Sequence, residues 1–502
     1  MKKIFIHIAA YIMTVVALGS VPMDALAQQM VHRRGTGSWR NEYHSLTKRN
    51  VDMSVLTLNL RHPGELKMRL HPEDYKNVTT IVLDGAINDA DIRVLADLAK
   101  RKTVVVKGKE RKAFLDIDLE NVRYFDGKQF SDRLPHNAFR DCSTLRSIVL
   151  PFRLRELGNR VFANCPRLEV VAMPDNLYKL GVSVFEGCES LVSIYIPDNV
   201  RVIPEQAFYR CSSLKEVSMP EGVEIIGARA FCYTSLAYAN LPRTVRSVEK
   251  QAFANSKISQ AFFPAWLPYC DAHAFDNSGL VEYVVEEGNA QYSSRNGVLY
   301  SLDGHELIAY PAHRNGTCVI PADVTSMRGD AFRGNMSIEE VVMECHLMGL
   351  GESMFKNCSA LRSVTLPEGM TVIGKEAFRG CKALTNIAMP ESLIRIDAEA
   401  FRACKGMTAI QLPSALEVIG EAAFDYCTKL QEISVPATVS MIGNKAFYNC
   451  DALMRIVMQG SVPPASTEKI NDNLKKVVLV VPSGAADAYR SATGWQKFRN
   501  IQ

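Results

Sequence analysis

The stretch from Gly369 to Lys375 has the glycine and lysine spacing of a loop that binds nucleotide phosphates. The next residue is Glu376, whereas that chemistry needs a serine or threonine hydroxyl to hold magnesium. The equivalent stretch from Gly222 to Ala228 keeps the two glycines without the lysine. We therefore interpret these glycines as turn residues and expect no nucleotide cofactor.

Histidine and cysteine are also candidates, because their side chains act as nucleophiles, bases or metal ligands in many proteins. The ten histidines are scattered, and the sequence contains neither an HExxH zinc motif nor a GxSxG nucleophile motif. The thirteen cysteines include no CxxC pair, and their common spacing of 23 residues matches no zinc-ligand pattern. Arg328 to Asp330 spells an integrin-binding tripeptide, which we interpret as a turn. The sequence therefore predicts no enzymatic activity, no metal and no other cofactor.

The 23-residue spacing extends to phenylalanine and proline, which identifies it as a structural repeat. Cysteine keeps this period at Cys165 and Cys188, and proline keeps it at Pro174 and Pro197. A fixed period indicates an array of stacked units rather than several globular domains. The phenylalanines that we expect to form the repeat core are Phe139, Phe162, Phe185, Phe208, Phe231, Phe355, Phe378, Phe401, Phe424 and Phe447.

Each unit has the pattern of one short strand followed by a turn. In the stretch from Leu361 to Pro367, apolar residues alternate with polar ones, and Pro367 ends the strand because it cannot donate to a ladder. The stretch from Gly369 to Phe378 then turns the chain and places Phe378 inward. One unit cannot bury its apolar face alone, but stacked units form a continuous core. The sequence predicts a β-rich, right-handed solenoid of about thirteen units with parallel strands.

The repeated cysteines allow two interpretations. An inward thiol three residues before the leucine of each strand packs as a small core residue. Because neighbouring rungs lie within cross-linking distance, an exported chain could instead form disulfides between them. The odd total of thirteen leaves at least one thiol unpaired within the chain in either case.

The repeated pattern carries a resemblance to a known family. Cys-x-x-Leu-x-x-Ile-x-Ile-Pro, followed by Val-x-x-Ile-Gly-x-x-Ala-Phe, resembles the BspA-like leucine-rich repeats of bacterial secreted and surface proteins. The stretch from Tyr292 to Pro311 is similar to a hairpin-bearing variant unit of that family, with turn dipeptides at Asn296 and Asp303. The resemblance implies a recognition protein that binds a host or partner protein or a glycan, because family members are associated with adhesion to matrix proteins and with co-aggregation.

The chain divides into an export signal, a solenoid and two caps. Two lysines, an apolar run from Ile4 to Val21 and the small residues Ala25 and Ala27 predict a signal peptide. We expect a protein of the bacterial envelope that is on the cell surface, secreted or periplasmic, with no integral membrane segment after cleavage. The predicted parts are 1–27, the signal peptide; 28–64, a flexible leader; 65–125, an N-terminal cap; 126–458, the solenoid, with the variant unit at about 280–312; and 459–502, a C-terminal cap.

The outward positions of the strands are the candidate ligand contacts. A formal charge of +4 over 502 residues predicts no nucleic-acid partner. The outward columns are largely uncharged and contain Tyr195, Tyr238, Asn240 and Phe262, a composition that suits an extracellular protein or glycan. These residues are also ordinary sheet formers. The first hypothesis is an adhesin-like recognition protein, and the alternative is a structural spacer or assembly scaffold without a dedicated ligand.

Overall fold

The computed structural model divides the chain into two compact units. The first consists of Met1–Ile258 and Trp266–Ala274, and the second of Ser259–Ala265 and Phe275–Gln502. The predicted signal peptide and residues 28–53 of the predicted leader lie outside the described residues. The described residues are 54–71, 74–101, 103–106, 109–385, 387–466, 470–471 and 476–502.

The first unit begins with a parallel sheet that has helices between its strands. The elements are β1 Ser54–Leu60, α4 Leu66–Arg69, α5 Asp74–Asn77, β2 Val78–Ile87, α6 Asp89–Leu98, β3 Thr103–Val106, β4 Lys109–Lys112 and β5 Leu115–Phe125. Asn88 starts α6 with a capping box: its side chain accepts from Ala90 N and Asp91 N, and Asp91 accepts from Asn88 N. This box satisfies N–H groups that the first helical turn leaves without partners.

The N-terminal sheet starts earlier than the sequence analysis predicts. β1 lies within the range predicted as a leader, yet it pairs in parallel with β2. Leu56, Leu58 and Leu60 alternate with more exposed residues, which is the pattern of a strand with one buried face. The sheet therefore begins at Ser54 and not at residue 65.

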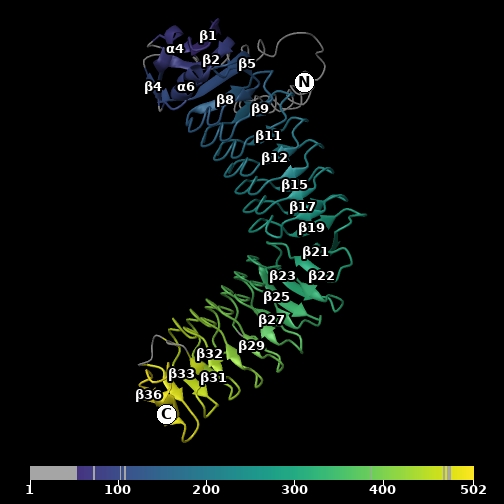
Figure 1. The fold of residues 1–502 in the computed structure, drawn as a ribbon, viewed down its shortest axis with the longest axis vertical. Helices are drawn as coiled ribbons and strands as arrows, with labels where there is room; N and C mark the ends of the chain where they lie inside the picture. The colour runs from purple at the N-terminus through teal and green to yellow at the C-terminus, as the bar shows by residue number, and fades with distance from the viewer. Residues whose placement is uncertain are drawn as a thin grey trace. The chain divides into compact units, whose positions relative to one another are not determined.

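Each repeat in the first unit contributes two short strands to two parallel ladders. These elements are β7 Arg133–Leu134, β8 Leu145–Val149, β9 Glu156–Leu157, β10 Val170–Ala172, β11 Ser193–Tyr195, β12 Val202–Ile203, β13 Glu216–Ser218, β14 Ile225–Ile226, β15 Tyr238–Asn240, β16 Ser247–Val248 and β18 Tyr269–Cys270. The short strand β6 Phe130–Ser131 instead pairs antiparallel with the end of β5. Tyr195 pairs with Ser218, and Ile203 pairs with Ile226, so a residue lies beside the one that follows it by 23. Successive coils stack in this way in Figure 1.

The second unit repeats this arrangement around an antiparallel insertion. Its elements are β17 Gln260–Phe263, β19 Glu282–Val285, β20 Tyr292–Arg295, β21 Val298–Ser301, β22 Glu306–Ala309, β23 Gly316–Ile320, β24 Ser326–Met327, β25 Ile338–Met343, β26 Gly349–Leu350, β27 Ser363–Thr365, β28 Val372–Ile373, β29 Arg395–Ile396, β30 Val418–Ile419, β31 Glu432–Val435, β32 Met441–Ile442, β33 Arg455–Met458, β34 Ala465–Ser466, β35 Val478–Val480, α7 Ala486–Ser491 and β36 Asn500–Ile501. β20, β21 and β22 pair antiparallel where the hairpin-bearing variant is predicted. Its first turn uses the left-handed backbone conformation at Asn296 and Gly297, with φ of 49° and 74°.

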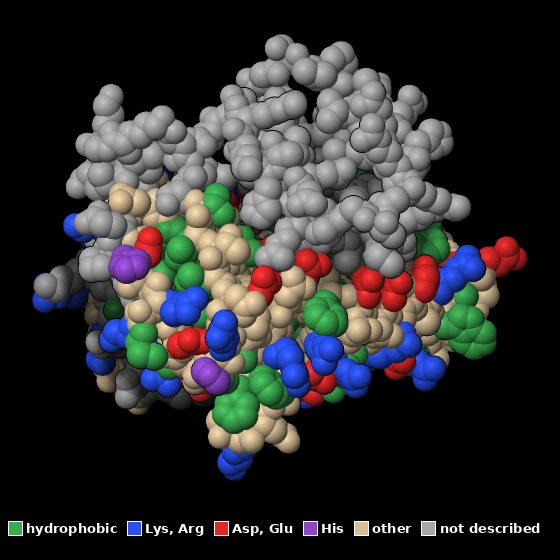
Figure 2. Space-filling model, turned by 90° about the horizontal axis from the view of Figure 1, so that it is seen from above, with side chains coloured by type: hydrophobic (Ala, Val, Ile, Leu, Met, Phe, Trp, Pro, Cys, Tyr) green, Lys and Arg blue, Asp and Glu red, His purple; other side chains and the backbone are tan. Residues whose placement is uncertain are grey.

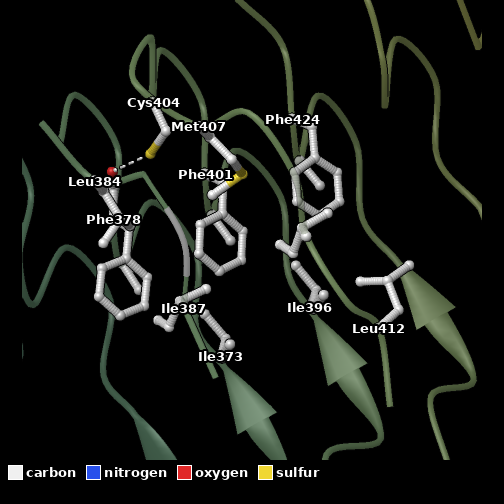
Figure 3. Packing of buried hydrophobic residues seen from close by; sticks show 14 of the residues in the cluster. Ile373, Phe378, Leu384, Ile387, Ile396, Phe401, Cys404, Met407, Leu412 and Phe424 are labelled. Atoms are coloured by element: carbon white, nitrogen blue, oxygen red, sulfur yellow. Dashed lines mark hydrogen bonds between the residues drawn. The ribbon is translucent and has the colours of Figure 1, made fainter. Parts of the chain in front are cut away.

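Stacked phenylalanines form the centre of the core in both units. All ten predicted core phenylalanines are fully buried. In the first unit, rings from Phe139 to Phe253 follow one another with centroids 5.2–5.8 Å apart. In the second unit, rings from Phe355 to Phe447 follow at 5.2–5.7 Å. Figure 3 shows Phe378, Phe401 and Phe424 side by side with isoleucine and leucine side chains beneath them.

The predicted solenoid is confirmed, but it has more turns than predicted. The described residues form about 19 stacked turns rather than thirteen. The difference arises because the strands of both predicted caps join the same parallel ladders: β1, β2 and β5 precede β8, while β35 and β36 follow β33. The phenylalanine count misses these turns because they lack the repeated phenylalanine.

Aromatic residues cover the last turns of the second unit. The indole of Trp495 donates from Nε1 to the Pro464 carbonyl at 2.9 Å, and the Tyr489 hydroxyl donates to the Gly460 carbonyl at 2.8 Å. Both side chains are fully buried, with every polar atom bonded to backbone. No helix within the described ranges combines the length and apolar character needed to span a bilayer.

Candidate functional site

The cysteines of the repeat serve packing and hydrogen bonding in this structure. All thirteen are buried and none forms a disulfide, so the structure has thiols where inter-rung disulfides were the alternative. The Sγ of Cys404 donates to the Phe378 carbonyl at 3.1 Å, as the dashed line in Figure 3 shows. Burial raises the pKa of Cys404, which keeps the thiol protonated and unreactive. The same contact, at 3.0–3.2 Å to the phenylalanine 26 residues earlier, is made by Cys165, Cys188, Cys211, Cys358, Cys381, Cys404, Cys427 and Cys450.

The residues of the two motifs that resemble a phosphate-binding loop and an integrin-binding tripeptide form turns and ion pairs within the fold. Gly369 has a φ of +87°, as a turn requires, and the Lys375 ammonium lies 3.3 Å from a Glu352 carboxylate oxygen. In the tripeptide from Arg328 to Asp330, the arginine lies 3.4 Å from Glu306. Among the described residues, no group of three or more His, Cys, Asp or Glu side chains is placed to hold a metal ion.

Of the predicted ligand contacts, the structure brings Tyr238 and Asn240 together. They lie two residues apart on the exposed face of β15, and the intervening Ala239 points into the core. Tyr238 is 67% exposed, so most of its ring is open to solvent. These two side chains form an open aromatic and amide surface on a rigid ladder.

Tyr195 and Phe262 are more enclosed than Tyr238. Tyr195 ends β11, two rungs before β15, and its hydroxyl lies 3.3 Å from Asp198 Oδ1. Burial and the negative charge of Asp198 raise the pKa of Tyr195 to about 12, so the phenol stays protonated at neutral pH. Phe262 belongs to the second unit, where it is half-buried on β17 and pairs in register with Val284 of β19.

Sequence reasoning missed the most exposed aromatic residue in the described part of the first unit. Trp266 is 79% exposed, and Tyr269, three residues later, is 50% exposed. Trp266 occupies the turn after a repeat proline, at the position that holds Asn199, Gly222 and Thr244 in earlier rungs. A tryptophan at a turn position that otherwise holds small residues indicates an exposed aromatic side chain, and the sequence alone shows it. Only the strand columns were considered as candidate contacts, and this position lies outside them.

Charged side chains are distributed without a strong bias on the face drawn in Figure 2. Lysine and arginine are intermixed with aspartate and glutamate there, and hydrophobic side chains occur in small groups. Opposite charges in such a mixture cancel at distances beyond about 10 Å at moderate salt. The side chains on this face therefore produce no strong long-range field.

The stacked parallel coils and their inward leucine, phenylalanine and cysteine columns define a leucine-rich-repeat solenoid. The chain belongs to the BspA type leucine-rich repeat family. The family model, described as a BspA type leucine rich repeat region, matches residues 108–192, 132–260, 179–295, 316–362 and 349–474. Repeat proteins of this family are generally non-catalytic.

Three of the solved structures to which the chain is similar are of bacterial proteins. A leucine rich cell surface protein of Faecalibacterium prausnitzii is 22% identical, with a TM-score of 0.42, over 76% of this chain and 84% of that one. A leucine-rich repeat protein of Bacteroides ovatus is 23% identical, with a TM-score of 0.46, over 70% and 87%. The pneumococcal vaccine antigen PcpA is 18% identical, with a TM-score of 0.45, over 90% and 95%. No curated protein matches the chain in sequence.

Proposed function

We propose that the chain is an exported, adhesin-like recognition protein that binds an extracellular protein or glycan on the strand face of its first unit. The observation that carries the proposal is the 67% exposure of Tyr238 beside Asn240 on β15. An exposed tyrosine offers a partner a large apolar surface with a polar tip at a low entropic cost. A parallel ladder holds such an anchor in place before binding, which reduces the ordering that binding requires.

The proposed location is the bacterial envelope or its surroundings. The apolar run from Ile4 to Val21, preceded by lysines and followed by small residues, has the order of an export signal. The buried thiols agree with either redox state of the compartment, because they are shielded from solvent and held by backbone carbonyls.

A binding panel tests the proposal. The purified chain is titrated against extracellular matrix proteins and neutral and acidic polysaccharides at physiological salt. We expect saturable binding of one panel member that Tyr238→Ala weakens at least about tenfold, or about 1.4 kcal/mol, as for an interface anchor. Trp266→Ala tests whether the exposed turn also contributes.

Tyr426→Ala is the matched control. Tyr426 is 42% exposed in the second unit and lies in a tight turn rather than on a strand. If the Tyr238→Ala variant binds with the same affinity as the native chain, the binding surface does not include Tyr238. Binding to no panel member would instead favour the alternative role as a structural spacer.

A further inference from the structure

The first unit contains a pocket where the N-terminal sheet meets the first repeat turn. β5 ends in a tight hairpin, in which Asp126 Oδ1 accepts from Lys128 N and Gln129 N, and β6 returns antiparallel to β5. The turn after β8 packs against the same strand, because Phe152 N donates to the Glu120 carbonyl at 3.0 Å. Between the hairpin and this turn lies a cavity of about 100 Å³, which is lined by residues that include Val122, Arg123, Phe130, Asp132, Pro151 and Arg153.

Two arginines at this pocket lack a carboxylate partner among the described residues. The Arg123 guanidinium lies 3.8 Å from the centre of the Phe130 ring, and the Arg153 guanidinium lies 5.2 Å from the centre of the Phe152 ring. Neither makes an ion pair within the described part of the chain. The one acidic lining residue, Asp132, is instead 3.7 Å from Arg155. The pocket therefore carries two cationic groups whose hydrogen-bond donors are available to a ligand.

The repeat sequence changes at this pocket. In most later rungs, the two residues after the repeat proline are small or acidic, as in the turns that begin at Asp175, Asp198, Glu221 and Glu368, and the exceptions, Arg243 and Trp266, each change only one of the two residues. At the first turn they are Phe152 and Arg153. Packing of the coil does not require this change, because Phe152 is 46% exposed. The departure from the repeat thus coincides with the cavity and with the unpaired guanidinium groups.

We propose that this pocket binds the carboxylate of an acidic sugar residue in a polysaccharide. Guanidinium groups bind carboxylates through paired hydrogen bonds, and two arginines, Arg123 and Arg153, line this cavity. The cavity is smaller than the engineered cavity of about 150 Å³ that accommodates benzene, so it admits a carboxylate while the sugar ring stays outside.

The aromatic rim distinguishes a sugar acid from an acidic peptide. Phe130 and Phe152 are 45% and 46% exposed beside the two arginines. The C–H face of a sugar ring packs on the electron-rich face of an aromatic ring. A uronic acid carries its carboxylate directly on such a ring and can make both contacts from one rigid group. An aspartate or glutamate side chain supplies only the carboxylate. This site is separate from the β15 surface and does not depend on the function proposed for it.

Calorimetric titration of the full chain with trigalacturonate tests the proposal. We expect saturable binding with a Kd of about 1 mM or tighter, and no binding of the methyl ester, which keeps the ring but lacks the charge. Arg123→Gln and Arg153→Gln should each weaken binding at least about tenfold, because each removes charged donors from the pocket. Phe130→Ala should weaken it through loss of the aromatic rim.

Arg140→Gln is the control for loss of one positive charge outside the pocket. Arg140 lies on the surface of the same unit, 3.5 Å from Asp141. Thermal unfolding of every variant establishes that it is folded. If one of the two arginine variants does not fold, the other still tests the pocket. Absence of trigalacturonate binding, or equal weakening by Arg140→Gln, would overturn the proposal. Equally tight binding of triglutamate would overturn the assignment to a sugar.

Discussion

At the scale of single residues, the position three after each core phenylalanine requires a small buried polar side chain more than a thiol. In rungs without cysteine, it holds Thr234, Ser256, Ser278 or Asn335. The Thr234 hydroxyl donates to the Phe231 carbonyl at 2.8 Å, and the Asn335 amide donates to the Pro311 carbonyl at 2.6 Å. The hydroxyls of Ser256 and Ser278 instead accept from the backbone N–H groups of Ile258 and Leu280. Each replacement thus keeps a polar side chain bonded to the backbone, where an apolar residue would leave a backbone group with one partner fewer.

Thiol labelling tests the state of the cysteine column. All thirteen cysteines are buried and none forms a disulfide, and burial raises the pKa of thiols such as Cys404 and Cys358. We expect fewer than two thiols to react with a thiol reagent in the folded chain at pH 8, and all thirteen to react after denaturation without reductant. Mass spectrometry of the alkylated chain counts them. A denatured count below twelve would indicate disulfides.

Phe401→Ala should be among the most destabilising substitutions. Phe401 is fully buried, and its ring lies between those of Phe378 and Phe424 at 5.2 and 5.3 Å. Removing it opens a cavity between two rungs, so we expect a loss of about 3–5 kcal/mol in unfolding free energy. Urea denaturation measures it. The exposed Tyr426→Ala serves as the control and should change the unfolding free energy by less than about 0.5 kcal/mol.

The columns of the repeat could be predicted from the sequence, but the details of the surface could not. The period places phenylalanine and cysteine in columns because equal spacing in a stacked coil means equal position. The period does not indicate which group each buried thiol hydrogen-bonds. The hydrogen bond from Cys404 to the Phe378 carbonyl is therefore known only from the structure. The same holds for Arg123 and Arg153, which lie 30 residues apart and meet because a hairpin and a turn pack on one strand.

At the scale of elements, the tight turns of the second unit form a column of alternating charges. Glu376 and Glu399 occupy equivalent turn positions, both with a φ of 57°. Each carboxylate contacts basic residues of its own and of a neighbouring turn, so the column links successive rungs independently of the core. The ion pairs along it are Lys356–Glu376, Arg379–Glu376, Arg379–Glu399 at 3.0 Å, Arg402–Glu399 at 2.8 Å and Arg402–Asp425 at 3.1 Å.

Glu376 should make the second unit sensitive to acid. Burial alone would raise its pKa, but hydrogen bonds from Lys356 and Arg379 outweigh burial and lower the pKa from 4.5 to about 2. Because the folded pKa lies below the unfolded one, the carboxylate stabilises the fold above pH 4.5, and this contribution is lost as the pH falls toward 2. We expect Glu376→Gln to lower the unfolding free energy at pH 7 by about 3 kcal/mol.

Urea denaturation from pH 7 to pH 2.5 measures this effect. The difference between the native chain and Glu376→Gln should shrink below pH 4.5. Glu352→Gln is the control, because Glu352 pairs with Lys375 at 3.3 Å through side chains that are 63% and 56% exposed. We expect the control to change stability by less than about 1 kcal/mol at any pH. A pH-independent difference for Glu376→Gln would contradict the role given to its charge.

At the scale of the whole chain, the caps are turns of the solenoid rather than separate lids. The predicted caps contain strand patterns, but the sequence does not indicate that β1, β2 and β5 pair in series with β8. Because these strands differ in length and spacing, their parallel pairing produces no repeated pattern in the sequence. Each unit therefore gains its stability from contacts between neighbouring turns, as in other repeat proteins.

Removal of one complete rung should preserve the fold. Deletion of residues 382–404 joins Cys381 to Lys405 and leaves Phe378 and Phe424 separated by one period. We expect this variant to remain folded, with a smaller urea m-value because less surface is buried. Circular dichroism during urea denaturation measures both quantities. Deletion of 12 residues from the same rung breaks the register and should abolish cooperative unfolding.

The even stacking of the rungs also has a mechanical consequence. Neighbouring turns in one unit are joined by ring contacts repeated at 5.2–5.7 Å, so the aromatic core joins successive turns in the same way. A pulling force applied to one end of such a stack peels turns in succession, and each released turn adds roughly 70–80 Å of extended chain. A protein tethered in flowing liquid would in this way absorb load by lengthening, while the turns still stacked keep their surface intact.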